Sequence, residues 1–288
     1  MRVYPAWPMA SSWCTASRPG ILLSAALASS SRNVLQSFSL EQPATQAAAD
    51  AIAQQLITSS YMVWPQYFDA ESVEQLLDTF NEHSFTSAGI GRNSQSQPQV
   101  RSSELYWLSD DDETHKKTAA EGSLVAHVES LRERLSQSCD LLLEPGDTEL
   151  MYARYPPGGF YARHNDVFRE AAGRATSTLL DPVRKISFIV YLSNQIWDEQ
   201  HGGCLRMWPP RPYDEYRHDD DTIWRSADDC IDIAPRAGTL VCFDSTIDHE
   251  VLPTTVTRCA VIGWFRSRIH SGKPVWNPYV PPARSHAM

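Results

Sequence analysis

The sequence lacks paired cysteines, long apolar runs and any excess of positive charge. Its six cysteines lie singly and none belongs to a CxxC pair, which argues against a zinc knuckle. A chain of 288 residues is long enough to form a stable core without disulfide bonds. We therefore expect reduced, mostly buried thiols. The longest apolar runs are too short for a membrane span. A net charge of −10 argues against nucleic acid as a partner of the whole chain.

Acidic residues are also missing from residues 1–40, which are rich in Ser and Ala and carry three arginines. This composition resembles an organelle transit peptide. A secretory signal around GILLSAALASS, a disordered tail and an over-extended start are the alternatives. We therefore expect an intracellular protein, organellar (plastid or mitochondrion) if the segment is a transit peptide and cytoplasmic otherwise. In every case we leave residues 1–40 outside the fold.

Residues 41–147 predict a helical support region with edge strands. Three segments have helix formers with apolar residues on one face, and Asp69 is placed to cap the second of them. The Ser- and Gln-rich segment 86–103 predicts a loop. The expected helices are residues 44–57, 69–83 and 121–138, and the expected strands are 61–68 and 104–108.

The pattern of apolar and turn-forming residues changes at about residue 148. From there, short apolar runs such as KISFIVYL, GTLVCF and RCAVIGWF alternate with turn residues. Evenly spaced short strands predict an all-β sandwich or barrel. We place this core at residues 148–268 and a Pro-rich irregular tail at residues 269–288.

The stretch YARHND carries the first candidate ligands. Alternate side chains of a strand share a face, so His164 and Asp166 can approach one point while Asn165 points away. A mononuclear iron site with open positions needs a second histidine. His249, which follows a strand, is the best candidate. Four other histidines compete on composition alone, namely His201, His218, His270 and His286.

Arg258 opens the strand RCAVIGWF, nine residues after His249. Alternation places Arg258 on the same face as Ala260, Ile262 and Trp264. A guanidinium on a largely apolar face needs an anion, because burying it unpaired is costly. The residue therefore predicts either a carboxylate clamp for a ligand or a structural ion pair within the protein.

Taken together, these residues resemble those of the Fe(II)/2-oxoglutarate dioxygenases. The triad and Arg258 stand in the order of that superfamily, and further segments resemble its prolyl 4-hydroxylase branch, of the EGLN/HIF prolyl hydroxylase type. They include TSAGIGR, VRSSELYWL, RYPPGGFYARHND and GGCLRMWP. The resemblance covers about residues 50–268. It implies a double-stranded β-helix, or jelly-roll, with supporting helices.

The resemblance also implies roles for individual residues. His164, Asp166 and His249 would hold Fe(II), and Arg258 would bind the distal carboxylate of 2-oxoglutarate with help from the Tyr191 hydroxyl. Three further roles follow: Tyr155 would line the iron pocket, Trp264 would form a wall on the substrate side, and Arg184 would lie near the substrate entrance. Strand alternation alone would instead set Arg184 on the face opposite Tyr191. Without the resemblance, Tyr155 and Tyr191 would be taken as aromatic core.

The activity so implied is hydroxylation of a prolyl residue in a protein or peptide, with decarboxylation of 2-oxoglutarate to succinate. O2 would be the co-substrate and ascorbate would keep the iron reduced. Two insertions, around residues 167–183 and 210–229, depart from the pattern and bear on the substrate. The alternatives are an oxygenase of a free amino acid or small metabolite, a non-catalytic β-helix binding module, and a cupin-type metalloprotein without 2-oxoglutarate.

Overall fold

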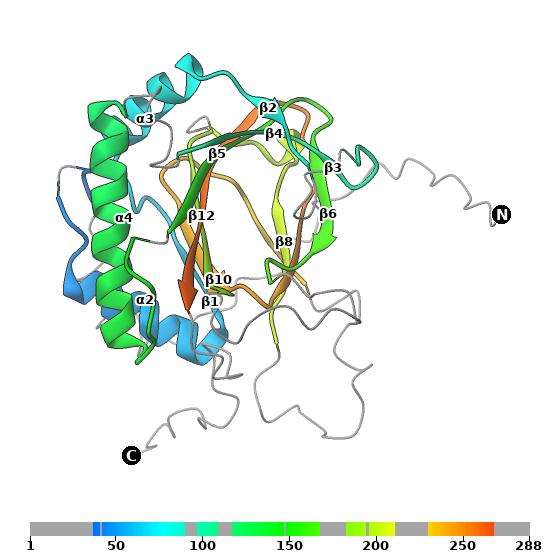
Figure 1. Cartoon of the computed structure of the whole chain (residues 1–288). Coiled ribbons are helices and arrows are strands. Elements are labelled where there is room, and N and C mark those ends of the chain that lie inside the picture. The colour runs from blue at the N-terminus through cyan, green and yellow to red at the C-terminus, as the bar shows by residue number, and fades with distance from the viewer. Residues whose placement is uncertain are drawn as a thin grey trace, which may run out of the picture.

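The computed structural model describes eight ranges of the chain: 37–40, 42–89, 97–108, 117–146, 148–167, 183–193, 196–210 and 230–267. In these ranges three α-helices lie on one side of a β core (Figure 1). The predicted targeting segment lies outside these ranges except for residues 37–40, and so do the Pro-rich tail and most of both insertions. Among the described helices, none is long and apolar enough to cross a membrane.

The three helices begin at side-chain caps. Helix α2 (Gln46–Ser59) begins after Thr45. Helix α3 (Ala70–Glu82) begins after Asp69, whose carboxylate accepts a hydrogen bond from the Ser72 amide, as predicted. Helix α4 (Ala119–Ser138) begins with a capping box, in which Thr118 and Glu121 each accept a hydrogen bond from the other's backbone amide. The predicted helix boundaries are therefore correct to within a few residues.

Two antiparallel sheets form the β core. The first has seven strands in the order β1-β10-β7-β12-β5-β4-β2, and the second has five in the order β3-β6-β11-β8-β9. The strands of the first sheet are Tyr61–Trp64, Leu240–Asp244, Val183–Tyr191, Arg258–Ser267, Glu149–Tyr155, Glu104–Trp107 and Thr86–Ser87 in that order. Those of the second are Arg101–Ser102, Phe160–His164, Asp248–Val251, Leu205–Trp208 and Ile231–Ile233.

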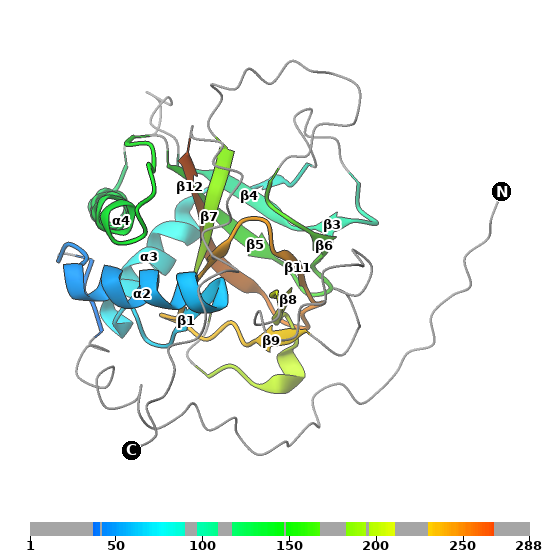
Figure 2. The same ribbon diagram turned by 90° about the horizontal axis from the view of Figure 1, so that it is seen from below.

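Strand β7 shows how the two faces of the larger sheet are used. Ile186, Phe188 and Val190 belong to the apolar cluster that contains the helices. Ile189 and Tyr191 belong to a second cluster, which also contains residues of β8 and β11 and therefore lies between the sheets. Figure 2 shows the helices on one side of β7 and β12 and the strands β8, β9 and β11 on the other. The predicted class, mainly β with a double-stranded β-helix core and supporting helices, is confirmed.

Two details differ from the expectations. Phe38 and Leu40, which we left outside the fold, are buried in the helical cluster, and the Phe38 amide bonds to the Tyr67 carbonyl. The loop predicted at residues 86–103 contains two edge strands, β2 and β3. Each has only two residues, which is too short to give a readable alternation pattern.

The cysteines also differ in part. Cys242 and Cys259 are buried, as expected for residues in apolar strands, but Cys139, Cys204 and Cys230 are half-buried. Within the described part of the chain none of these five forms a disulfide, and Cys14 lies outside it.

Candidate metal centre and adjoining cavity

Two neighbouring strands of the smaller sheet bring three candidate ligands together. His164 ends β6, and His249 stands directly opposite it on β11. Asp166 lies two residues beyond β6, where its amide donates to the Ser245 carbonyl (3.0 Å). The shared face predicted for His164 and Asp166 is thus produced by a bend after the strand rather than by strand alternation.

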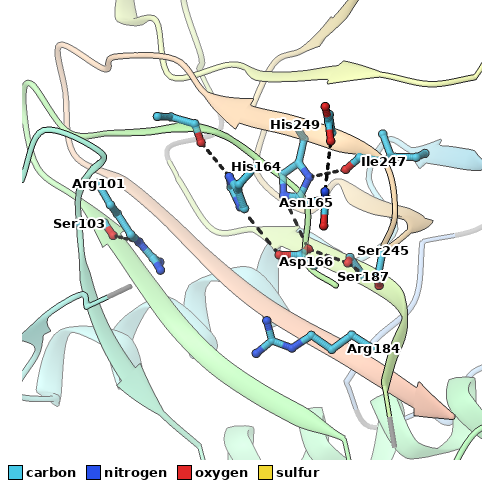
Figure 3. Close-up of polar contacts among 12 residues, drawn as sticks. Arg101, Ser103, His164, Asn165, Asp166, Arg184, Ser187, Ser245, Ile247 and His249 are labelled. Carbon is cyan, nitrogen blue, oxygen red and sulfur yellow. Dashed lines mark hydrogen bonds and ion pairs between the residues drawn. The ribbon is translucent and has the colours of Figure 1, made fainter. Parts of the chain in front are cut away.

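The three side chains converge on one point (Figure 3). His164 Nε2 lies 3.8 Å from Asp166 Oδ1, and His249 Nε2 lies 3.6 Å from Asp166 Oδ2. One ligand atom from each residue lies within 4.8 Å of the others. Two imidazoles and one carboxylate on one side of a point leave the other side open, as in the facial sites of mononuclear iron.

Hydrogen bonds fix which nitrogen of each imidazole faces that point. His164 Nδ1 lies 2.8 Å from the Ala162 carbonyl, and His249 Nδ1 lies 2.9 Å from the Ile247 carbonyl. A carbonyl oxygen only accepts, so each Nδ1 carries a proton and each Nε2 keeps its lone pair. This arrangement orients imidazoles as metal ligands.

The electrostatics favour the protonation states that a metal requires. Burial and the neighbouring His249 lower the pKa of His164 to about 3, which keeps the imidazole neutral. Burial by itself would raise the pKa of the Asp166 carboxyl. The two histidines and the Ser187 hydroxyl, which donates to Asp166 Oδ2 over 2.7 Å, outweigh burial and hold that pKa below its ordinary value. The carboxylate is therefore charged at neutral pH.

The residues flanking the trio point elsewhere. Asn165 donates to Asp248 Oδ1 (3.3 Å), away from the ligands, as alternation predicted. His201 lies in the short 3₁₀ helix η1 (Glu199–His201), where its Nδ1 accepts from the Asp198 amide. The other competing histidines, His218, His270 and His286, lie outside the described residues.

Arg258 begins β12 opposite Tyr155 and is fully buried. None of its three guanidinium nitrogens has a hydrogen-bond partner among the residues that the structure describes. Its guanidinium carbon lies 4.9 Å from the Tyr155 ring centre and 5.0 Å from that of Tyr191. A buried guanidinium held only between two rings needs an anion to offset its desolvation. Within the described ranges Arg258 has no internal ion pair, so the structure favours a carboxylate clamp for a ligand over a structural ion pair.

Two further features surround that guanidinium. Burial raises the pKa of the Tyr191 hydroxyl to about 12 although the Arg258 charge opposes the shift, so the hydroxyl keeps its proton and can donate. Gly203 has a φ of +69°, and a Cβ there would lie 3.3 Å from Arg258 Cδ and closer still to Thr254. A glycine therefore leaves room beside the arginine that a larger side chain would fill.

Arg184 faces the same cavity, contrary to the strand alternation that would set it opposite Tyr191. The β7–β12 register shifts between Ile186, which pairs with Phe265, and Arg184, which pairs with Arg266. One extra residue in β7 forms a bulge that turns Arg184 to the inner face. There its guanidinium lies 3.6 Å from the Trp264 ring centre and binds both carboxylate oxygens of Glu149.

All eight residues singled out in the sequence lie in the space between the sheets. A cavity of about 280 Å³ is lined by seven of them, namely Tyr155, His164, Asp166, Arg184, His249, Arg258 and Trp264, and Tyr191 packs behind Arg258. The sequence reasoning missed Ser187, which shares its strand face with Ile189 and Tyr191 and could have been found from that alternation. It also missed Tyr161, whose ring stacks on His164 at 3.6 Å, and Arg101.

The comparisons with known proteins agree with this geometry. Residues 150–266 match the model of the 2OG-Fe(II) oxygenase superfamily, and this range contains every proposed ligand. This part of the chain is therefore similar to the domain of that superfamily. A comparison with curated protein sequences gave no match.

Solved structures with a similar fold include three prolyl hydroxylases. A Pseudomonas putida prolyl-4-hydroxylase is 28% identical, with a TM-score of 0.59 over 77% of this chain and 100% of that one. A prolyl hydroxylase from Trichoplax adhaerens is 21% identical (TM-score 0.56, 76% and 89%). One from Phytophthora capsici is 20% identical (TM-score 0.52, 78% and 64%). The resemblance to the prolyl 4-hydroxylase branch is thereby confirmed, while the last two show the fold alone.

The residues fit the groups that the superfamily requires. Both histidines present lone-pair nitrogens beside a charged carboxylate, which suits Fe(II). The unpaired Arg258 guanidinium suits a carboxylate such as that of 2-oxoglutarate.

Proposed function

We propose that this oxygenase hydroxylates a prolyl residue in a protein or peptide and converts 2-oxoglutarate to succinate and CO2. The observation that carries the proposal is the pairing of the oriented His-Asp-His trio with a buried arginine that has no anion of its own. The similarity to the Pseudomonas putida prolyl-4-hydroxylase supports a prolyl substrate.

In this proposal His164, Asp166 and His249 hold the metal through Nε2, a carboxylate oxygen and Nε2. Fe(II) with 2-oxoglutarate and O2 supplies the oxidation that breaks a C–H bond of the substrate. Ser187 positions Asp166 through its hydrogen bond, and the backbone carbonyls of Ala162 and Ile247 position the histidines. The ligand geometry is therefore set before the cofactors bind.

Arg258 would bind the distal carboxylate of 2-oxoglutarate, and the protonated Tyr191 hydroxyl would donate to the same group. Tyr155, opposite Arg258, would line the side of the pocket that the 2-oxo acid occupies. Trp264 is 4% exposed and would form the wall on the substrate side, with Arg184 above its ring. These residues orient the co-substrate and exclude water from it.

Two further proposals have other grounds. A requirement for ascorbate is implied by the family resemblance, and an organellar or cytoplasmic location is proposed from the composition of residues 1–40. An oxygenase of a free amino acid or small metabolite is the alternative substrate class. A non-catalytic module or a cupin-type protein without 2-oxoglutarate would have no use for a buried, unpaired Arg258.

Mass spectrometry of proline-containing peptides incubated with the protein, Fe(II), 2-oxoglutarate and ascorbate tests the proposal. We expect a gain of one oxygen on proline and an equal amount of succinate. Peptides in which alanine replaces proline control for other hydroxylated residues. Succinate formed with free amino acids but with none of the peptides would contradict the prolyl-peptide assignment.

A further inference from the structure

Arg101 also lines this cavity. It begins the two-residue strand β3 and stands directly opposite Tyr161 on β6. Its guanidinium carbon lies 4.5 Å from the Tyr161 ring centre, and that ring stacks on His164. Arg101 is thus linked to the metal centre through a single aromatic ring.

The guanidinium of Arg101 has only one polar partner among the described residues. Its Nε donates to the Ser103 hydroxyl over 2.7 Å, and no carboxylate of the described ranges lies within ion-pair distance of it. The residue is half-buried, so its two terminal nitrogens remain accessible to a ligand. Figure 3 shows Arg101 and Arg184 extending from different sides toward the space beside the trio.

The other charges of the cavity leave Arg101 as the excess cation. Arg184 is paired with Glu149, a carboxylate that also lies 3.6 Å from Arg266 Nε, and Asp166 is the one carboxylate among the described lining residues. With the cofactors of the proposed function bound, the charges of Fe(II), 2-oxoglutarate, Asp166 and Arg258 cancel. One positive charge, that of Arg101, then remains on the cavity lining, in a chain whose net charge is −10.

We infer that Arg101 recognises a carboxylate side chain close to the target proline of the substrate. The planar guanidinium presents two adjacent N–H groups that match the two oxygens of Asp or Glu. Its position beside Tyr161 places that carboxylate next to the metal centre rather than on a remote surface. This inference rests on the proposed function, because it concerns which prolyl peptides the site accepts.

Peptide binding measured without turnover tests the inference. Labelled peptides carry one central proline, with a single Asp at each of the neighbouring positions in turn, and a matched set carries Asn instead. Their affinities are measured anaerobically by fluorescence anisotropy with Fe(II) and 2-oxoglutarate present. At one or more positions we expect the Asp peptide to bind about tenfold more tightly than its Asn counterpart, as one charge-assisted hydrogen bond provides.

Variants connect that preference to Arg101. Arg101→Gln should remove the difference between Asp and Asn peptides, and Arg101→Glu should make a Lys peptide the preferred ligand at that position. Arg154→Gln is the matched control, because Arg154 is also half-buried and lies over an aromatic ring, but is paired with Glu104 and does not line the cavity. That variant should keep the preference for Asp.

Three results would overturn the inference: equal binding of Asp and Asn peptides, a preference that survives in Arg101→Gln, or tighter binding of free L-proline than of every Asp peptide. The last result would assign the carboxylate to a free amino acid. Peptides that show an Arg101-dependent preference but are never hydroxylated would instead contradict the proposed function, so the two failures are distinguishable.

Discussion

Replacing Arg258 with methionine should separate the stability of the protein from its response to 2-oxoglutarate. The guanidinium is fully buried without a hydrogen-bond partner among the described residues, so it costs stability when no anion is bound. An apolar side chain of similar length removes that cost. Without 2-oxoglutarate, the free energy of unfolding of Arg258→Met should equal or exceed that of the wild type.

The response to 2-oxoglutarate should change in the opposite direction. Losing one partner of a buried charge pair costs about 3 kcal/mol, which raises the Kd roughly 150-fold. At a concentration of about 100 times the wild-type Kd, the wild type gains about 2.7 kcal/mol and the variant about 0.3 kcal/mol. For a domain of this size these gains correspond to shifts in Tm of roughly 5–10 °C and about 1 °C.

Thermal unfolding under anaerobic conditions with Fe(II), followed with and without 2-oxoglutarate, measures both effects. Arg206→Met is the control, because Arg206 lies on β8 and pairs with Asp232 outside the cavity. It should keep the wild-type shift. A full 2-oxoglutarate shift in Arg258→Met would refute the assignment of this arginine.

Three further predictions concern the trio and the helical layer. His249→Gln should reduce bound iron, measured by metal analysis, from about one equivalent to nearly none; glutamine is preferred to alanine because His249 is 4% exposed and packs on the core. Ser187→Ala should weaken iron binding about tenfold, the lower end for loss of a residue that orients a ligand. Burial lowers the pKa of His127, whose Nε2 accepts from Tyr67, below its unfolded value of about 6.5. The stability from the neutral ring is complete above that pH and is lost as the pH falls, so Tm should drop more steeply below about pH 6.5 in wild type than in His127→Gln.

Local patterns predicted the elements well because each signal lies within a few residues. The apolar residues of α3 and α4 recur every three or four positions, and the Asp69 cap involves neighbours in the chain. The structure places these features as expected. The pair His164 and Asp166 could be recognised for the same reason. Their meeting with His249 depends on the pairing of β6 with β11, for which the spacing along the chain carries no direct signal.

The features that the sequence did not reveal arise from irregular geometry. The bulge in β7 turns Arg184 toward the cavity, and one extra residue in a strand leaves no mark in the apolar pattern. Strand β3 is too short to be read from periodicity, so the sequence pattern predicts a loop at Arg101. The place of Arg101 at the cavity therefore required the register between strands, whereas Arg184 was expected there from the family resemblance although strand alternation opposed it.

The most direct test of the central claim is a visible spectrum recorded during anaerobic titration of the protein with Fe(II) and then 2-oxoglutarate. We predict a weak metal-to-ligand charge-transfer band that needs both components and saturates at one equivalent of each. The band should be absent in His249→Gln, require far more 2-oxoglutarate in Arg258→Met and be unchanged in Arg206→Met. Failure of the wild-type protein to bind Fe(II) or to develop the band would contradict the assignment of this cavity as an Fe(II)- and 2-oxoglutarate-binding site.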